Sequence, residues 1–451
     1  MKFVEAAGGI VPLRRHVRIG VTGLARSGKT SLLTSLAINL LALSRGVPAL
    51  PAVSRHLAGR SIRVRLAAAG ASSMPRFNPL EKSASLAADP PSWPSPTDTV
   101  SVLELDLDID QPGTAGALWP AARLRLEILD YPGEWLIDLP LLGQDFADWS
   151  ADALKRLDTE PDAATFLRFL HGLPPATVAD EALARTGHDL YVAALRALQA
   201  KGRAMLQPGR FLMPPPGAAP PWMAFFPMPG ASRLAALMAQ RFDAYRTAVR
   251  TGLSGPGFAR VDRLVVLADI LGALHAGPAA FADQALALGT VARALQNRPP
   301  LPLLPSWLQP WGIGRIAFAA TKADHVARAQ RANLASLLRS LTELAGDVPA
   351  PAFARAFARP FALAAIACTE DFTWTLDGRP VSAVRGHVAG QGVLRSYPGE
   401  VPDRAPDAGW WQHPFLSLPA FAPKRLEPGG RGAITQLALD ELLVFLLEDV
   451  L

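Results

Sequence analysis

The chain contains very little cysteine: Cys368 is the single cysteine among 451 residues. An intrachain disulfide is therefore impossible. Zinc fingers and iron–sulfur clusters held by this chain alone are excluded as well, because both need at least two cysteines. The composition favours a reducing compartment.

Long apolar runs are also missing, and none reaches the ~18 residues of a membrane-spanning helix. The nearest candidate, Leu264–Leu274, is interrupted by Asp269 and followed by His275. The first residues do not resemble a secretion signal, because Glu5 and two glycines interrupt them. We therefore expect a cytoplasmic protein, and leave peripheral contact with the inner membrane open.

A dense basic block is absent, although the formal net charge is +6. The nearest candidate, Arg14–Arg18, is short. The charge is either dispersed over the surface or gathered on a face for an anionic membrane or nucleic acid. No basic-aromatic module accompanies it, so we expect no nucleic-acid partner. The sequence does not indicate an oligomeric state.

Apolar residues are plentiful at 50%, which excludes global disorder. Short buried-strand patterns alternate with helical spacing, and this predicts an α/β fold with helices on both faces of a mostly parallel sheet. The second and third strands would form its antiparallel edge. Six strands are expected, at Val17–Thr22, Val100–Ile109, Arg123–Leu129, Arg263–Ala268, Arg315–Ala320 and Phe361–Ala367.

The domain organisation follows from where this alternation stops. We expect the sheet to be built from residues 1–134 and 259–369, divided by a mainly helical insertion at 135–258. The aromatic cluster within Trp222–Phe226 is expected to be core under a Pro-rich loop.

Residues 370–431 are rich in glycine and proline and are expected to form a hairpin and loop insertion. Asp377-Gly378 is typical of the tight turn of a hairpin. Residues 432–451 are expected to form a C-terminal helix that packs on the sheet.

The most specific motif is Gly23-Leu-Ala-Arg-Ser-Gly-Lys-Thr30, which fits G-x-x-x-x-G-K-[ST] between a predicted strand and helix. Its glycines let the backbone approach phosphates, and successive N–H groups at the helix N-terminus bind the anion. Lys29 would reach the β- and γ-phosphates, and the Thr30 hydroxyl would ligate Mg²⁺. Nucleotide contacts are expected from Gly23, Ala25, Arg26, Ser27, Gly28, Lys29, Thr30 and Ser31.

A second motif, Asp130-Tyr-Pro-Gly133, follows a predicted strand. In nucleotide switches such an Asp lies near Mg²⁺, and the Gly N–H bonds the γ-phosphate; the alternative is an ordinary strand-to-turn sequence. The loop before Val100 should supply a switch threonine as a further Mg²⁺ ligand. Thr97 and Thr99 both qualify, and we prefer Thr97.

A third motif, Thr321-Lys-Ala-Asp324, follows the strand that ends at Ala320. The Asp324 carboxylate would accept hydrogen bonds from guanine N1 and the 2-amino group, donors that adenine lacks. The Lys322 stem would cover the base, and Thr321 replaces the commoner Asn. The alternative is a helix N-cap Asp with a surface Lys. Cys368 and Thr369 lie where a second base-contacting loop is expected.

These motifs extend into a resemblance that covers nearly the whole chain. The chain resembles the YcjX family of bacterial P-loop proteins. This implies GTP binding by a Ras-like G domain with an added helical domain, a link to envelope stress near the phage-shock genes, and a membrane-protein partner. The segments that carry the resemblance are Gly23–Thr30, Asp89–Thr97, Asp130–Pro140, Gln207–Leu212, Ala320–His325, Arg385–His387 and Tyr397–Pro402.

The expected catalytic residues are Lys29, Glu134 and Arg26. Glu134 stands where many switches have a water-orienting Gln. Its carboxylate would accept a proton from water but repel a triphosphate, so slow intrinsic turnover is expected; the alternative is an ion pair with an arginine. Arg26 would contact a phosphate or switch, or pair with Glu134 or Asp138.

We therefore expect a GTPase that converts GTP to GDP and phosphate as a conformational switch. Nucleotide state would move the helical insertion through residues 134–145. Two other functions stay open: an ATPase, if Asp324 is away from the base, and a nucleotide-bound scaffold that does not hydrolyse.

Overall fold

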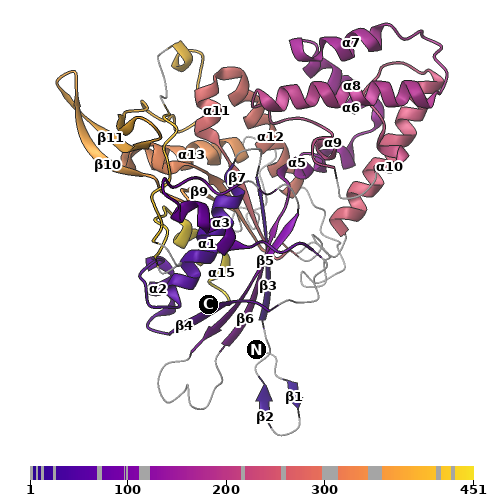
Figure 1. Ribbon diagram of the computed structural model, residues 1–451. Coiled ribbons are helices and arrows are strands. Elements are labelled where there is room, and N and C mark those ends of the chain that lie inside the picture. The colour runs from indigo at the N-terminus through magenta and orange to yellow at the C-terminus, as the bar shows by residue number, and fades with distance from the viewer. Residues whose placement is uncertain are drawn as a thin grey trace.

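The computed structural model describes most of the chain (Figure 1). The described residues are 4–6, 9–11, 15–23, 27–68, 74–95, 97, 100–110, 122–214, 219–254, 261–296, 313–343, 358–412, 418–427 and 432–451. Within these ranges, none of the helices combines the length and the apolar character that crossing a bilayer requires.

The centre of the fold is a seven-stranded sheet with the order β4-β5-β6-β3-β7-β8-β9. Five neighbours, β6, β3, β7, β8 and β9, pair in parallel, whereas β5 is antiparallel to both β4 and β6. The strands are β3 (Arg15–Gly23), β4 (Ile62–Leu66), β5 (Ser101–Ile109), β6 (Ala122–Asp130), β7 (Arg263–Ala268), β8 (Arg315–Ala320) and β9 (Ala358–Ala362).

The predicted count of six strands is wrong, because β4 forms an additional edge strand beyond β5. β4 has five residues and buries only Ile62 and Val64, while Arg63 and Arg65 are exposed. So short a strand with arginines on one face has too little apolar signal to be recognised. The last strand also differs from prediction, since β9 ends at Ala362.

Helices cover both faces of the sheet, as predicted. Alternate residues of β7 point to opposite sides: Val265 and Leu267 join one core, and Leu264 and Val266 join the other. The first core contains α1 (Lys29–Leu43) and α15 (Leu439–Leu447), and the second contains α12 (Pro278–Gln296) and α13 (Arg328–Glu343).

The chain between β6 and β7 is mainly helical and lies at the upper right of Figure 1. Its core is aromatic: Phe225 and Phe226 are fully buried, which confirms the core prediction for them, and Trp149 stacks on Phe242 with ring centroids 4.9 Å apart. The elements are α5 (Gly133–Leu136), η1 (Leu139–Gly143), α6 (Phe146–Leu157), η2 (Pro161–Ala163), α7 (Ala164–His171), α8 (Glu181–Ala200), α9 (Gly209–Leu212), η3 (Pro221–Met223) and α10 (Arg233–Ser254).

A second, three-stranded antiparallel sheet follows β9. It contains β10 (Thr369–Leu376), β11 (Arg379–Val388) and β12 (Gly392–Ser396). Asp377 and Gly378 both have positive φ, 48° and 75°, so they form the expected tight turn between β10 and β11. The remaining elements are β1 (Val4–Ala6), β2 (Gly9–Val11), α2 (Pro51–Leu57), α3 (Pro79–Ala87), α11 (Ile270–Ala276), η5 (Ala323–His325) and η6 (Trp410–Gln412).

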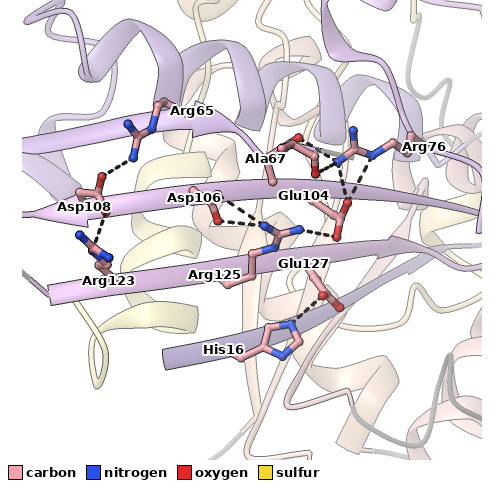
Figure 2. A network of polar contacts seen from close by, with 11 residues as sticks. His16, Arg65, Ala67, Arg76, Glu104, Asp106, Asp108, Arg123, Arg125 and Glu127 are labelled. Atoms are coloured by element: carbon pink, nitrogen blue, oxygen red, sulfur yellow. Dashed lines mark hydrogen bonds and ion pairs between the residues drawn. The ribbon is translucent and has the colours of Figure 1, made fainter. Parts of the chain in front are cut away.

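Charged side chains line one face of β4, β5 and β6 (Figure 2). Arg125 bonds Glu104 at 2.8 Å and Asp106 at 3.2 Å, and Arg76 bonds the other oxygen of Glu104 at 2.8 Å. Farther along, Asp108 pairs with Arg65 at 2.6 Å. We call this set the charged ladder; it consists of Arg65, Arg76, Glu104, Asp106, Asp108, Arg123 and Arg125.

Candidate nucleotide-binding site

Three of the motifs lie at one edge of the sheet. β3, β6 and β8 run parallel, so their carboxyl ends meet at the same edge, where parallel sheets bind ligands. Gly23 ends β3, Asp130 ends β6, and Thr321 directly follows β8. The topology therefore gathers motifs separated by up to three hundred residues of sequence.

The phosphate-loop motif has the backbone that its glycines predict. A Cβ on Gly23 would lie 2.2 Å from Ser27 Oγ and 2.8 Å from Leu267 Cβ, so only glycine fits there. Gly28 has φ 84°, in the left-handed region, and α1 begins at the next residue with no side-chain cap on its first N–H groups. These amides are therefore available to bind an anion.

Lys29 and Ser31 lie in the first turn of α1. The Lys29 ammonium donates to the Gly23 carbonyl at 3.2 Å, so its side chain folds back over the loop. Ala25 and Arg26 lie outside the described residues, as does Thr99. The alternatives for Arg26, phosphate contact or ion pair, therefore stay open.

Oxygen atoms of three motif residues form a continuous chain beside the loop. Thr30 Oγ1 is 3.1 Å from Thr97 Oγ1, which donates to Asp130 Oδ2 at 2.6 Å. Asp130 is only 3% exposed, and this burial raises its pKa, although Thr97 and Lys29 act in the opposite direction. Hydroxyl and carboxylate oxygens are the donors that Mg²⁺ prefers, so these residues fit that ion.

Two buried polar atoms near this chain have no hydrogen-bond partner among the described residues. One is the hydroxyl of Ser27, which is 1% exposed, and the other is Glu134 Oε2. Glu134 follows Gly133 at the start of α5, and its charge acts on Asp130. Buried polar atoms without partners are costly, and a bound ligand at this site would satisfy these two.

The base motif is held from both sides. Asp324 is 2% exposed, and its Oδ2 accepts the Cys368 N–H at 2.8 Å, while the Thr369 hydroxyl donates to its carbonyl oxygen. Thr321 donates to the Ala268 carbonyl through its N–H at 2.9 Å. The Cys368 N–H therefore contacts the Asp324 carboxylate, and a contact of this loop with a base stays a prediction.

Two residues of the base region were missed by the sequence reasoning. Asp269 forms an ion pair with Lys322, whose backbone is left-handed at φ 60°. Its signal was its position directly after β7, at the carboxyl end of a parallel strand. His325 lies beside Asp324, and its Nε2 is 3.8 Å from the Cys368 sulfur. Burial lowers the pKa of His325.

The strongest unanticipated contact joins the second motif to the helical segment. Asp138 is fully buried; its Oδ1 accepts the Gly209 N–H at 2.7 Å and its Oδ2 accepts the Arg210 N–H at 3.3 Å. The Tyr245 hydroxyl donates to the same carboxylate. Burial raises the pKa of Asp138 to about 6, although Arg210 and these donors lower it in part.

Further bonds extend this contact along residues 134–138, and α5 lies beside α9 in Figure 1. The Trp135 indole donates to the Met213 carbonyl at 2.8 Å, and the Gln207 amide donates to the Ile137 carbonyl at 2.6 Å. A Cβ on Gly209 would lie 1.7 Å from the Glu134 carbonyl oxygen. We call this contact between residues 134–138 and 207–213 the switch clasp.

Comparison with known proteins agrees with the motifs. The model of the YcjX-like family, DUF463, matches residues 17–451. A protein named Ras-like GTPase YcjX from Escherichia coli K12 is 34% identical over 454 residues, covering 97% of this chain and 96% of the relative. A protein of the same name from Shewanella oneidensis is 31% identical over 468 residues, covering 97% and 95%. The predicted resemblance is confirmed: the chain belongs to the YcjX-like family.

Proposed function

We propose that this protein binds GTP and GDP with Mg²⁺, hydrolyses GTP slowly, and uses the nucleotide state to move its helical segment. The observation that carries the proposal is the meeting of the phosphate loop, the Thr30–Thr97–Asp130 chain and Asp324 at one sheet edge. Two relatives named Ras-like GTPase support the same function.

The phosphate end would bind the nucleotide through fixed positive groups. The uncapped N–H groups at the start of α1 would donate to phosphate oxygens, and Lys29 would leave the Gly23 carbonyl to contact the β- and γ-phosphates. Thr30, Thr97 and Asp130 would hold Mg²⁺. When bound, that ion neutralises charge on the β- and γ-phosphates.

The base end would select guanine through Asp324. Guanine offers N1–H and a 2-amino group to a carboxylate, whereas adenine has no donors at those positions. The bonds from Cys368 and Thr369 support this role, because they fix the position of Asp324 before the base arrives. Lys322 and Thr321 would form the wall of the base site.

Hydrolysis would depend on positioning of water beside the γ-phosphate. Glu134 lies one residue after Gly133, and its buried Oε2, which has no partner among the residues that the structure describes, would accept a proton from water. The same negative charge would repel the triphosphate, which accounts for slow turnover. Arg26 would stabilise charge on the phosphates.

The switch clasp would transmit the nucleotide state. A change at Gly133 and Glu134 reaches Asp138 within five residues, and Asp138 bonds the Gly209 and Arg210 amides. Hydrogen exchange of residues 140–255 should therefore differ between the GDP form and a form with a non-hydrolysable GTP analogue. Identical exchange in the two forms would overturn the switch part of the proposal.

On the family resemblance we also propose a cytoplasmic, stress-related role with a membrane-protein partner. No feature of the described residues identifies that partner. The domain organisation expected from the sequence, with a G domain divided by a helical insertion at 135–258, is part of the same proposal.

The deciding experiment is a parallel titration of the purified protein with GTP, GDP and ATP in Mg²⁺, repeated on Asp324→Ala and Lys29→Ala. We expect guanine preference in the native chain, loss of that preference in Asp324→Ala, and loss of all nucleotide binding in Lys29→Ala. If ATP binds as tightly as GTP, or if Asp324→Ala keeps the nucleotide preference of the native chain, the proposal of a GTPase gives way to that of an ATPase. If GTP-loaded protein releases phosphate no faster than the background rate, the non-hydrolysing scaffold becomes the supported function.

A further inference from the structure

A compact set of possible metal ligands lies around the base motif. Asp324, His325 and Cys368 each offer one ligand atom, and the three atoms lie within 4.8 Å of one another. The Cys368 sulfur is 3.1 Å from Asp324 Oδ2 and 3.8 Å from His325 Nε2. The Cys368 side chain therefore lies between a carboxylate and an imidazole.

The two separations at the Cys368 sulfur are close to those between neighbouring ligands of a zinc site. Zinc bonds of about 2.3 Å to sulfur and about 2.0–2.2 Å to nitrogen or oxygen give ligand–ligand distances of roughly 3.4–3.6 Å. The observed separations at Cys368 are 3.1 and 3.8 Å, so small side-chain movements would suffice. A thiolate and an imidazole favour Zn²⁺ over Mg²⁺, which prefers oxygen donors.

Burial keeps water away from this set of side chains, and packing restricts the rotation of the imidazole. Asp324 and Cys368 are 2% and 3% exposed, so water competes weakly at the centre of the set. The His325 ring packs edge-on against Phe421 with centroids 5.3 Å apart, which limits its rotation. A mere thiol-to-carboxylate hydrogen bond would explain the position of Cys368 but not why an imidazole nitrogen faces the same sulfur.

We propose that Asp324, His325 and Cys368 form a site for a zinc-like divalent cation that competes with the guanine base for Asp324. Binding replaces the thiol proton of Cys368 by the metal and releases one proton to solvent; the neutral imidazole and the carboxylate bind unchanged. A cation on Oδ2 removes the negative charge that guanine N1–H and its 2-amino group would contact. The competition, though not the cation site, rests on the proposed function.

The cation arm of the test uses nucleotide-free protein and Co²⁺ as a spectroscopic probe. We expect one Co²⁺ per chain with a thiolate-to-cobalt absorption band that Zn²⁺ abolishes. Cys368→Ser is the matched control, because it keeps a hydroxyl for the Asp324 contact and all eight histidines of the chain. The same band in this variant, or no band in the native protein, would overturn the inference.

A second variant tests the site independently, in case Cys368→Ser does not fold. His325→Phe keeps an aromatic ring against Phe421 and removes both ring nitrogens. It should retain the thiolate band but bind Co²⁺ at least about tenfold more weakly. An unchanged affinity, in a variant whose circular dichroism matches the native protein, would remove His325 from the site and contradict the proposal.

The competition arm compares GDP affinity in a chelator with GDP affinity in excess Zn²⁺, within each variant. We expect at least about a tenfold weakening by Zn²⁺ in the native protein and a ratio near one in Cys368→Ser. GDP binding without a cobalt band overturns this inference and leaves the proposed function intact. A cobalt band without GDP binding overturns the proposed function and the competition, while the cation site stands.

Discussion

Buried carboxylates at the candidate site differ from the carboxylates of the charged ladder in what they bind. Asp138 and Asp324 accept backbone N–H groups from segments 71 and 44 residues away in sequence. In the charged ladder, Glu104, Asp106 and Asp108 pair instead with the side chains of arginines that are 28, 19 and 43 residues away in sequence. Bonds of the first kind hold one loop against another. Bonds of the second kind lie on the face of a sheet that backbone hydrogen bonds already hold together.

The difference has an energetic consequence. A backbone amide cannot turn away to find another partner, so removing a buried carboxylate strands a donor without water. An arginine on the sheet face can bond solvent or a second carboxylate. Arg125, for example, contacts both Glu104 and Asp106. We therefore expect large effects at the site carboxylates and small ones where the ladder is exposed, as at Arg123.

The largest effect should follow Asp138→Ala. The change leaves the Gly209 and Arg210 amides and the Tyr245 hydroxyl without their acceptor inside the protein. We expect the free energy of unfolding at pH 7 to fall by about 3–5 kcal/mol, measured by urea denaturation. Asp108→Ala in the charged ladder is the matched control. Equal losses of stability in the two variants would contradict the difference between the two kinds of carboxylate.

The pH dependence of the free energy of unfolding should reveal the contribution of the Asp138 carboxyl group. Burial raises the pKa of Asp138 to about 6 from an ordinary 3.8, so between these values the folded chain binds the proton more tightly than the unfolded chain. The resulting stabilisation is complete below pH 4 and is lost as the pH rises through 6. Two pKa units correspond to roughly 3 kcal/mol.

Urea denaturation of the native protein and Asp138→Asn between pH 4 and pH 7 measures this contribution. The stability of the native protein relative to the variant should decrease by roughly 2.5 kcal/mol across that range. Parallel stability curves would show that Asp138 has an ordinary pKa and that its burial is compensated.

A smaller effect is expected at the base end. Thr369→Val removes the hydroxyl that donates to the Asp324 carbonyl but preserves side-chain shape. Stability should fall by about 1 kcal/mol, and GDP affinity should fall a few-fold because Asp324 is less well fixed. Thr373→Val on the exposed part of β10 is the control. A larger loss of GDP affinity in the control would contradict the role of Thr369.

Sequence reasoning recovered the parts of the fold that local patterns encode. The parallel core strands are short and apolar, so β3, β7 and β8 were predicted within a few residues of their bounds. The three motifs lie at the ends of β3, β6 and β8, so their positions follow from the strand predictions. β4 was not predicted because two of its five residues, Arg63 and Arg65, are exposed and charged.

The switch clasp could not be predicted for a different reason. In the sequence, Asp138 is an ordinary polar residue after a motif, and Gly209 is an ordinary glycine in a Pro-rich stretch. Their bond depends on how the helical segment folds back onto α5, and the two residues are 71 positions apart. A fully buried Asp has no local signature; only the tertiary structure shows what it accepts.

The smallest effect should be at Arg123, at the edge of the charged ladder. Its side chain is 62% exposed and lies 3.9 Å from Asp108, which keeps Arg65 at 2.6 Å as a closer partner. Arg123→Ala should therefore change the free energy of unfolding by less than about 0.5 kcal/mol in urea denaturation. A loss above about 1 kcal/mol would mean that the ladder is cooperative, since a solvated arginine alone cannot account for it. Exposed ion pairs and buried carboxylates would then no longer be distinct in this protein.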